Sequence, residues 1–397
     1  MGSSYDVIIV GGGVIGSSIA FHLSKSKHIS VALVDVKKKG NASYASAGGL
    51  WQLGDLLGLG GCGQLEEENS TAPVMTGGHS DYPNYFFDLC MKSNALFPAL
   101  WDELYHDYGI DFKYEKTGLK FIVYSERELH KAKNTASSIE HLKSHFVWLD
   151  AQELRKSEPN ISQEAIGSLM FVNDHQVNPF LLVDAYREGA RKNGAELLLN
   201  SHVIDIMTRD HRIHGVSTDK GQLQCHTLIN AAGAWAGEIM ALVTKEHLPV
   251  KPIKGQCLIS EKLPKILSSC ISSNDCFMAQ KDGGEILVGS TTEDVGFDAS
   301  CTFDSLRALA KGAVRCLPIL RHTHIKRSWV GFRPGSPDGM PILGPVSDVD
   351  NYFNACGHYK TGILTSVITG QIFAALLDGQ KPPVDIQPYL LKRFDTS

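Results

Sequence analysis

The chain has 397 residues, 43% of them hydrophobic, so it can bury a sizeable core, and general disorder is excluded. Its formal net charge is −5, and the lysines and arginines are scattered among 43 acidic residues. This balance offers no basic face for nucleic acid and no polybasic membrane anchor, so we expect no nucleic-acid partner.

The first 35 residues predict a nucleotide-binding unit. Residues 6–10 have the apolar run of a buried strand, residues 11–16 form a glycine-rich turn, and residues 17–24 have the apolar spacing of a helix. A second apolar strand, 30–34, ends in Asp35, which lies 19 residues after Gly16. Strand, turn, helix and acid therefore occur in the order that a dinucleotide fold requires.

Each residue of this turn has a physical task. Gly11 permits the tight turn, Gly13 lets the backbone approach a pyrophosphate, and Gly16 lets the helix pack close to the strand. The helix N-terminus then faces the phosphates. Asp35 can accept hydrogen bonds from the ribose hydroxyls, which favours a nucleotide without a 2′-phosphate.

Three later segments favour FAD over NAD as the nucleotide. Residues 40–49 are a run of small and hydroxyl residues, suited to hydrogen bonds along an extended cofactor. Residues 227–236 read as a buried strand that runs into a small-residue turn. Residues 352–356 read as a strand, 357–362 as a turn and 363–377 as a long apolar helix, whose N-terminus can stabilise an anionic reduced flavin.

The middle of the chain contains both the apolar spacing of helices and that of strands. Residues 181–192 predict an amphipathic helix, whereas 196–207, 222–230 and 285–289 predict strands. The glycine-rich, acidic stretch 54–78 fits either a surface loop or a contact with a partner subunit, and its composition does not rank the two.

Several motifs together resemble one known family. The segments VIIVGGGVIG, SYASAGGLW, LINAAGAWA, PIKGQ, ILVGSTTED, GFRPGSPDGMPILGP and GHYKTGIL occur in the order seen in the D-amino acid oxidase-like flavoproteins. The resemblance covers nearly the whole chain, and within the family it is nearest to the glycine oxidases and the C subunits of bacterial hydrogen cyanide synthases.

The resemblance implies an α/β fold, α+β overall. A Rossmann-like FAD-binding domain would carry a doubly wound sheet, and a substrate domain would carry a large, mainly antiparallel sheet. On this basis we expect the FAD-binding domain at 1–85, 145–238 and 325–397, and the substrate-binding domain at 86–144 and 239–324.

The resemblance also implies a substrate site. Arg333 matches the arginine that binds the substrate carboxylate in the family, and its planar fork suits that task. The alternative is a turn arginine that pairs with Asp338. Two positions depart from the family pattern: Lys360 stands where an arginine is usual, and Phe277 stands where a tyrosine is typical. The clamp is therefore weaker or differently built: either the substrate differs from glycine, for instance an N-substituted or larger amino acid, or a neighbour such as Tyr359 supplies the missing donor.

The expected cofactor is FAD, held noncovalently, and no metal ligands are expected. Trp51 either walls the pocket or belongs to the core, and His358 is expected to contact the cofactor rather than to transfer protons. The residues expected to bind FAD are Gly11, Gly13, Val14, Ile15, Gly16, Asp35, Val36, Ser43, Ala45, Ser46, Ala47, Gly48, Gly49, Leu50, Val203, Ala232, Gly233, Trp235, Arg333, Gly357, His358, Lys360, Thr361, Gly362 and Ile363.

Three functions are consistent with this site. The first is a dehydrogenase subunit, as in hydrogen cyanide synthase, which oxidises the C–N bond of glycine or a related D-amino or N-substituted amino acid by hydride transfer to flavin N5. An iron–sulfur and a flavoprotein subunit would be its partners. The second is a self-sufficient glycine, sarcosine or D-amino acid oxidase that produces hydrogen peroxide. The third is a noncatalytic flavoprotein subunit of a complex.

The sequence also bears on location. Nine cysteines occur without a CxxC pair, which fits reduced thiols and a cytoplasmic protein. We expect no signal peptide, because the first apolar run begins at Tyr5 and is cut by three glycines, and no transmembrane segment, because no run of 18 apolar residues occurs. Peripheral attachment to an inner-membrane complex stays open.

Overall fold

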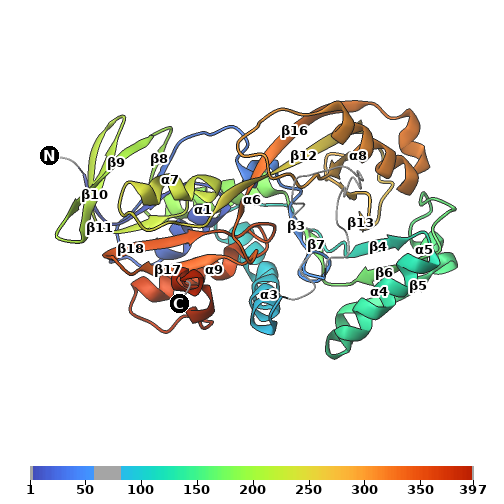
Figure 1. The fold of residues 1–397 in the computed structure, drawn as a ribbon, viewed down its shortest axis with the longest axis horizontal. Helices are drawn as coiled ribbons and strands as arrows, with labels where there is room; N and C mark the ends of the chain where they lie inside the picture. The colour runs from blue at the N-terminus through green and yellow to red at the C-terminus, as the bar shows by residue number, and fades with distance from the viewer. Residues whose placement is uncertain (1–2, 58–81, 396–397) are drawn as a thin grey trace.

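The computed structural model describes residues 3–57 and 82–395, and it places two eight-stranded sheets side by side (Figure 1). The first sheet has the strand order β17-β18-β11-β1-β2-β8, with β10 and β9 continuing antiparallel from β11. Its strands are β1 (Ser4–Val10), β2 (Val31–Asp35), β8 (Glu196–Leu199), β9 (Val203–Arg209), β10 (Arg212–Thr218), β11 (Gly221–Asn230), β17 (Ile342–Val346) and β18 (Val349–Cys356).

The central strands β18, β11, β1, β2 and β8 of this sheet run parallel. Ile8 of β1 pairs with Leu228 on one side and Ala32 on the other, and all three are fully buried. Both faces of these strands are covered, which explains their continuous apolar runs.

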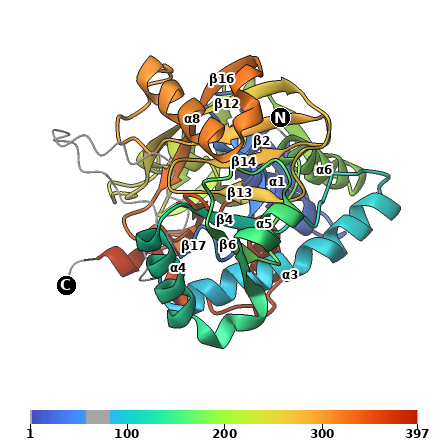
Figure 2. The same cartoon turned by 90° about the vertical axis from the view of Figure 1, so that its right-hand side faces the viewer.

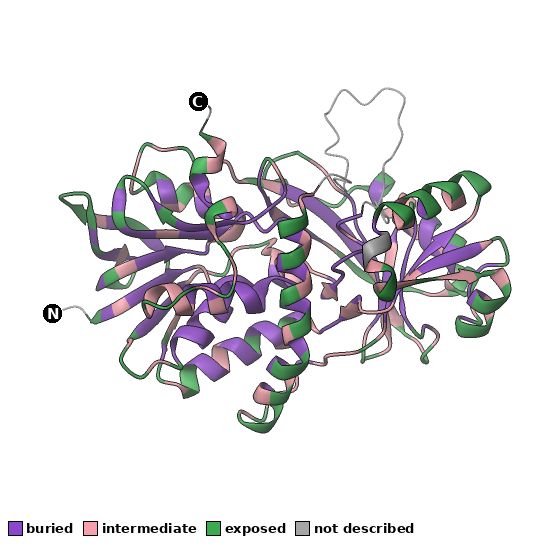
Figure 3. Ribbon diagram, turned by 90° about the horizontal axis from the view of Figure 1, so that it is seen from below, coloured by how far each residue is buried: buried purple, intermediate pink, exposed green. Residues whose placement is uncertain are grey.

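Helices and the β9–β10 meander cover the two faces of the first sheet. One face carries α1 (Val14–Leu23), α3 (Asn84–His106), α6 (Pro179–Lys192) and α9 (Ser366–Leu377). The other carries the meander and α7 (Ala236–Ala241). Figure 3 shows the buried residues concentrated in the strands and in the helices packed against them, and every residue of α1 is buried. The side chain of Asn178 caps α6 by accepting from Phe180 N, and Pro179 occupies the first turn, as the sequence favours.

The second sheet has the order β16-β12-β15-β14-β13-β4-β6-β5 and is antiparallel except between β13 and β4. Its strands are β4 (Leu119–Val123), β5 (Phe146–Asp150), β6 (Gly167–Phe171), β12 (Lys251–Lys262), β13 (Cys270–Ser272), β14 (Phe277–Gln280), β15 (Glu285–Gly289) and β16 (Ile325–Gly335).

Helices α5 (Ala151–Ser157) and α8 (Phe303–Cys316) pack on the outer face of this sheet (Figure 2), whereas α4 (Glu126–Ser138) packs on the opposite face through Ala132. Its inner face packs against the chain around Ala47 and Leu53. The remaining short elements are α2 (Ala42–Ala45), β3 (Gly49–Leu50), β7 (His175–Gln176) and the 3-10 turns Glu140–His145, Gly233–Trp235, Pro318–His322, Gln387–Tyr389 and Leu391–Phe394.

The predicted fold class is confirmed, since a mixed α/β sheet lies beside a mainly antiparallel one. The single strand predicted over 196–207 was wrong: the chain forms β8 and β9, separated at Asn200, whose φ of 64° is left-handed. The domain boundaries stay a prediction. Strand β6 pairs with β4 of the second sheet and β5 pairs with β6, so we propose to count 146–171 with the substrate domain.

Among the helices of residues 3–57 and 82–395, none combines the length and the apolar character needed to cross a membrane. The cytoplasmic location stays a prediction. The stretch 54–78 is described only from Gly54 to Leu57, so its predicted role as a loop or partner contact lies largely outside the described residues.

Candidate active site

A cavity of about 480 Å³ lies between the two sheets. The carboxyl ends of the parallel strands line one side of it, through Val10 of β1, Asp35 of β2 and Cys356 of β18. Strands β14 and β16 of the second sheet line the other side, through Phe277 and Arg333. Ligands of open α/β sheets bind outside the carboxyl ends of the strands, so this cavity is the expected ligand site.

The glycine turn forms one end of the cavity. Gly11 has a φ of 105°, and a Cβ there would lie 2.4 Å from Ala231 O. A Cβ on Gly16 would lie 1.9 Å from Gly11 O, so only glycine lets α1 pack against the turn. Gly13 is the N-cap of α1 and provides no side-chain cap. Apart from Val14 N, which donates to Ser43 Oγ, the first N–H groups of α1 are therefore available to an anionic ligand.

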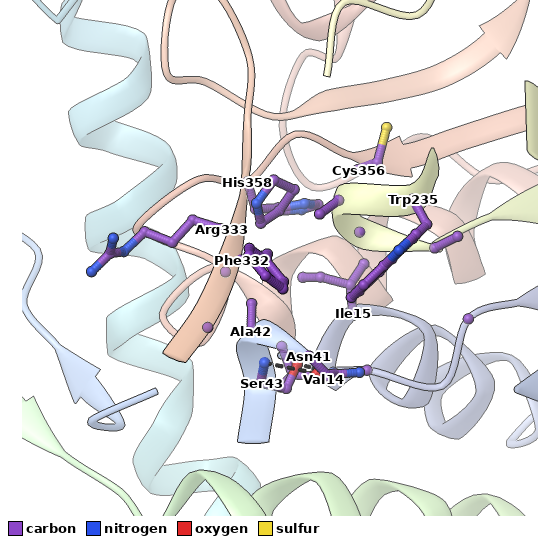
Figure 4. Close-up of a pocket in the computed structure, with 18 of the residues that line it drawn as sticks. Val14, Ile15, Asn41, Ala42, Ser43, Trp235, Phe332, Arg333, Cys356 and His358 are labelled. Carbon is purple, nitrogen blue, oxygen red and sulfur yellow. Dashed lines mark hydrogen bonds between the residues drawn. The ribbon is translucent and has the colours of Figure 1, made fainter. Parts of the chain in front are cut away.

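Ser43 joins the 40–49 segment to this helix. Its hydroxyl accepts a 2.9 Å hydrogen bond from Val14 N, while Asn41 Oδ1 accepts one from Ser43 N at the start of α2 (Figure 4). Asn41 and Ala42 also line the cavity and were not singled out from the sequence. The small side chains of Ala42, Ser43 and Ala45 on α2 leave room for a ligand beside the N-terminus of α1.

Replacing Ser43 with alanine should weaken FAD binding about tenfold, because Val14 N loses its acceptor and the phosphate site loses a hydroxyl. Equilibrium titration of the apoprotein with FAD would measure this change. The matched control is Ser137→Ala on α4, where the hydroxyl bonds only to Lys133 O of its own helix. Equal affinities in Ser43→Ala and the wild type would remove Ser43 from the phosphate site.

Asp35 is held in place by an arginine that the sequence analysis missed. Asp35 Oδ1 accepts from Gly12 N at 2.9 Å, and Oδ2 pairs with Arg187 Nη2 at 3.0 Å. Arg187 also donates to Gly12 O and, at 2.9 Å, to Tyr44 Oη. Burial raises the pKa of Asp35, whereas the hydrogen bond from Gly12 N and the charge of Arg187 lower it. Arg187 therefore connects α6 to the glycine turn. It also orients Asp35, the residue predicted to bind the ribose hydroxyls.

Arg333 lies at the opposite end, held against β12. Its Nη1 donates to Thr291 O at 3.1 Å and to Lys254 O at 3.5 Å, and its Nη2 donates to Ser290 Oγ. A Cβ on Gly255 would lie 2.6 Å from the guanidinium, so this glycine makes room for it. Figure 4 shows the side chain extending away from Ser43 and Trp235.

The alternative in which Arg333 pairs with Asp338 is wrong. Asp338 forms a two-pronged pair with Arg393, at 2.8 and 3.1 Å. Arg333 has no carboxylate within 4 Å in the described part of the chain. A guanidinium has five N–H donors and three are engaged as above, so two remain for a carboxylate ligand.

Aromatic and charged side chains surround the Arg333 end. Trp51 and Phe277 meet edge to face with centroids 5.1 Å apart, and both line the cavity. Trp51 is at the same time part of the core, so both interpretations of it hold. Tyr359 has a φ of 44°, and its buried hydroxyl has no hydrogen-bond partner among the described residues. Lys360 lines the cavity beside it.

His358 is buried and lines the cavity before α9. Its Nε2 lies 3.2 Å from Thr369 Oγ1, and burial lowers the pKa of the ring to about 3. The imidazole is therefore neutral at physiological pH, and its expected contact with the cofactor stays a prediction. Helix α9 begins at Ser366, whereas the last cavity-lining residue is Ile363, so the preceding turn and not the helix itself reaches the cavity.

Most of the residues predicted for the site line this one cavity. Those that do are Gly11, Gly13, Val14, Ile15, Asp35, Val36, Ser43, Ala45, Ser46, Ala47, Gly49, Val203, Ala232, Gly233, Trp235, Phe277, Arg333, His358, Tyr359, Lys360, Gly362 and Ile363. Those outside its lining are Gly16, Gly48, Leu50, Gly357 and Thr361, which pack behind it, and their contact with the cofactor stays a prediction.

Comparison with known proteins identifies the family. Residues 6–376 match the family of FAD dependent oxidoreductases (DAO). The chain belongs to this family. It is 50% identical over 405 residues to hydrogen cyanide synthase subunit HcnC of Pseudomonas protegens, covering 99% of this chain and 97% of that protein. It is 30% identical over 391 residues to glycine oxidase of Geobacillus kaustophilus, covering 98% of this chain and 97% of that protein.

The fold agrees with the family. The crystal structure of glycine oxidase from Geobacillus kaustophilus superposes with a TM-score of 0.85 at 29% identity, covering 99% of this chain and 100% of that one. The protein is therefore an FAD-dependent oxidoreductase, and FAD is its cofactor. The cavity fits that group: the N-terminus of α1, whose N-cap Gly13 has no side chain, lies at one end, and the buried Tyr359 hydroxyl, which has no hydrogen-bond partner among the described residues, lies at the other. Its noncovalent attachment stays a prediction.

Proposed function

We propose that this protein oxidises the carbon–nitrogen bond of a small amino acid, with glycine, sarcosine or a small D-amino acid as substrate. The guanidinium of Arg333 carries the proposal, because it faces the cavity with two donors unengaged and, among the described residues, has no carboxylate within 4 Å. A charged arginine with unengaged N–H donors at a cavity wall favours a carboxylate ligand. Bound FAD supplies the acceptor for the hydride of the substrate α-carbon.

The residues of the chain position the substrate. Arg333 would hold the carboxylate, while Trp51 and Phe277 form an apolar wall that limits the side chain to a small group. Lys360 adds a second positive charge at the same end of the cavity. Holding the carboxylate at a fixed point aims the α-carbon at the cofactor, and such orientation is a large part of the rate of an enzyme of this kind.

We further propose that electrons leave through partner subunits, as the similarity to a subunit of hydrogen cyanide synthase supports. In that case an iron–sulfur and a second flavoprotein subunit take the electrons from the reduced protein. A self-sufficient oxidase that produces hydrogen peroxide is the alternative, supported by the similarity to glycine oxidase.

Anaerobic titration of the purified yellow protein tests this function. Glycine, sarcosine, D-alanine and D-proline are added in turn, while the absorbance of oxidised flavin near ~450 nm is followed. Bleaching by one of them is the expected result. Admitting air then separates the two proposals: slow recovery supports a partner-dependent dehydrogenase, and fast recovery supports an oxidase. A protein that dithionite bleaches but no amino acid does would contradict C–N oxidation and favour a noncatalytic subunit.

The double variant Phe277→Tyr with Lys360→Arg should raise activity with glycine relative to larger amino acids by about tenfold, because it adds a hydroxyl donor and a second fork to the carboxylate end. The ratio of anaerobic reduction rates measures the change. The matched control is Phe303→Tyr with Lys326→Arg, since Phe303 is 95% exposed and Lys326 is also on the surface. An unchanged ratio would mean that these positions do not set specificity.

A further inference from the structure

Three carboxylates line the cavity within the part of the chain that the structure describes: Asp35, Asp55 and Glu238. Two of them already have cationic partners at the nucleotide end, since Asp35 pairs with Arg187 at 3.0 Å and Glu238 with Lys38 at 3.0 Å. Asp55 is the remaining one. It lies close enough to Arg333 and Lys360 that their charges act on it, so it belongs to the substrate end.

The chain holds Asp55 firmly in this place. Asp174 lies beneath the preceding residues and accepts from Gly54 N at 2.8 Å and from Leu53 N at 3.3 Å. The side chains of Leu53 and Leu56 on either side are fully buried. Because this segment is anchored on both sides, the Asp55 carboxylate has a fixed position in the cavity.

The surroundings of Asp55 set its proton affinity. Burial raises its pKa above the ordinary value, while the positive charges of Lys360 and Arg333 lower it. The other titratable groups that face it are Asp174, Tyr82 and Cys90, whose own pKa values the charge of Asp55 raises. Burial has the larger effect, so the pKa of Asp55 stays above its ordinary value, and its carboxylate is a better proton acceptor than one in water.

The proposed substrate needs such a group. A free amino acid is a zwitterion, and Arg333 accounts for its carboxylate but not for its ammonium. An ammonium nitrogen has no lone pair, so it must lose a proton before its α-carbon can release hydride and form a C=N bond. A carboxylate at the amine serves both needs, because it pairs with the cation and then accepts its proton.

We propose that Asp55 is the residue that recognises the amino group of the substrate and removes its proton. One N–H bond breaks, the proton moves to a carboxylate oxygen of Asp55, and the electron pair stays on nitrogen. Asp55 thus selects amines over hydroxy acids of the same size. This inference rests on the proposed oxidation of an amino acid and adds the group that prepares the substrate for it.

The variants Asp55→Asn and Asp55→Glu of the FAD-loaded protein test this role. Anaerobic stopped-flow measures the limiting rate of flavin reduction against pH, with whichever of glycine, sarcosine, D-alanine and D-proline reduces the wild type. Binding of acetate, followed by the change in the flavin spectrum, reports on the carboxylate clamp alone. Asp210→Asn, on the exposed turn between β9 and β10, is the matched control.

We expect Asp55→Asn to lower the rate at neutral pH by about a hundredfold. This difference in rate from the wild type should shrink as the pH approaches the pKa of the substrate ammonium in solution, because the amino acid then binds with a neutral amino group. Asp55→Glu should keep most of the rate, and acetate should bind Asp55→Asn at least as tightly as the wild type.

A rate in Asp55→Asn within about threefold of the wild type, or a deficit that is the same at every pH, would overturn the inference and leave the proposed function intact. Weakened acetate binding in Asp55→Asn would likewise overturn it, because Asp55 would then only hold Lys360 and Arg333 in place. Absence of reduction in the wild type itself would remove both proposals.

Discussion

Replacing Arg333 with alanine is expected to weaken the binding of every carboxylate substrate by about two to three orders of magnitude while the spectrum of bound FAD stays normal. Loss of one partner from a desolvated, hydrogen-bonded ion pair costs roughly 3–5 kcal/mol, and each 1.4 kcal/mol is about tenfold in affinity. The cofactor should be retained, because the glycine turn, Ser43 and Asp35 lie at the other end of the cavity.

Steady-state or reductive titration with the substrate found for the wild type measures this effect. Arg327→Ala is the matched control, since it removes an arginine from the exposed part of the same strand, where the guanidinium packs on Trp329. Arg333→Lys should recover only part of the loss, because an ammonium keeps the charge but not the fork. Unchanged substrate constants in Arg333→Ala would remove Arg333 from the substrate site.

The nucleotide end of the site was predictable because local sequence determines it. Gly11, Gly13 and Gly16 each meet a steric demand that only a residue without a Cβ satisfies, and their order along the chain follows the strand–turn–helix geometry. The small residues around Ser43 likewise predicted that the backbone of this segment approaches a ligand closely. Periodicity then identified the buried strands, although it joined β8 and β9, which are separated by the polar run 200–202 with Asn200 in the left-handed region.

The missed residues depend on contacts between distant segments. Arg187 lies 152 positions from the Asp35 that it orients, on a helix whose sequence pattern reports only an amphipathic face. Asp338 and Arg393 are 55 positions apart, and their pairing leaves Arg333 without a competing carboxylate. Asp55 stands in a stretch whose glycines and acids suggested a surface loop, whereas Asp174, 120 positions from Gly54, draws it inward. No local pattern encodes such partners.

Asp174→Asn is expected to remove most of the pH dependence of folding stability between pH 6.5 and 8. Burial raises the pKa of Asp174 to about 8, with the charge of Asp55 adding to the effect, so the folded protein keeps a proton that the unfolded chain releases near its ordinary value of about 3.9. The contribution of Asp174 to folding stability is fully present below the unfolded-state pKa of about 3.9 and is lost as the pH rises through the folded-state pKa of about 8. The slope is up to ~1.4 kcal/mol per pH unit.

Urea unfolding of the FAD-saturated protein at pH 5, 6, 7 and 8 would measure the effect as a difference between variant and wild type. The upper half of that range is decisive, because burial lowers the pKa of His22 and of His175 to about 4, and these groups make stability rise with pH below their ordinary value of 6.5. An asparagine can still accept from Gly54 N but does not titrate. Parallel stability curves for the two proteins would show that Asp174 is ionised in the folded state, and the segment that carries Asp55 would then be anchored by a charge.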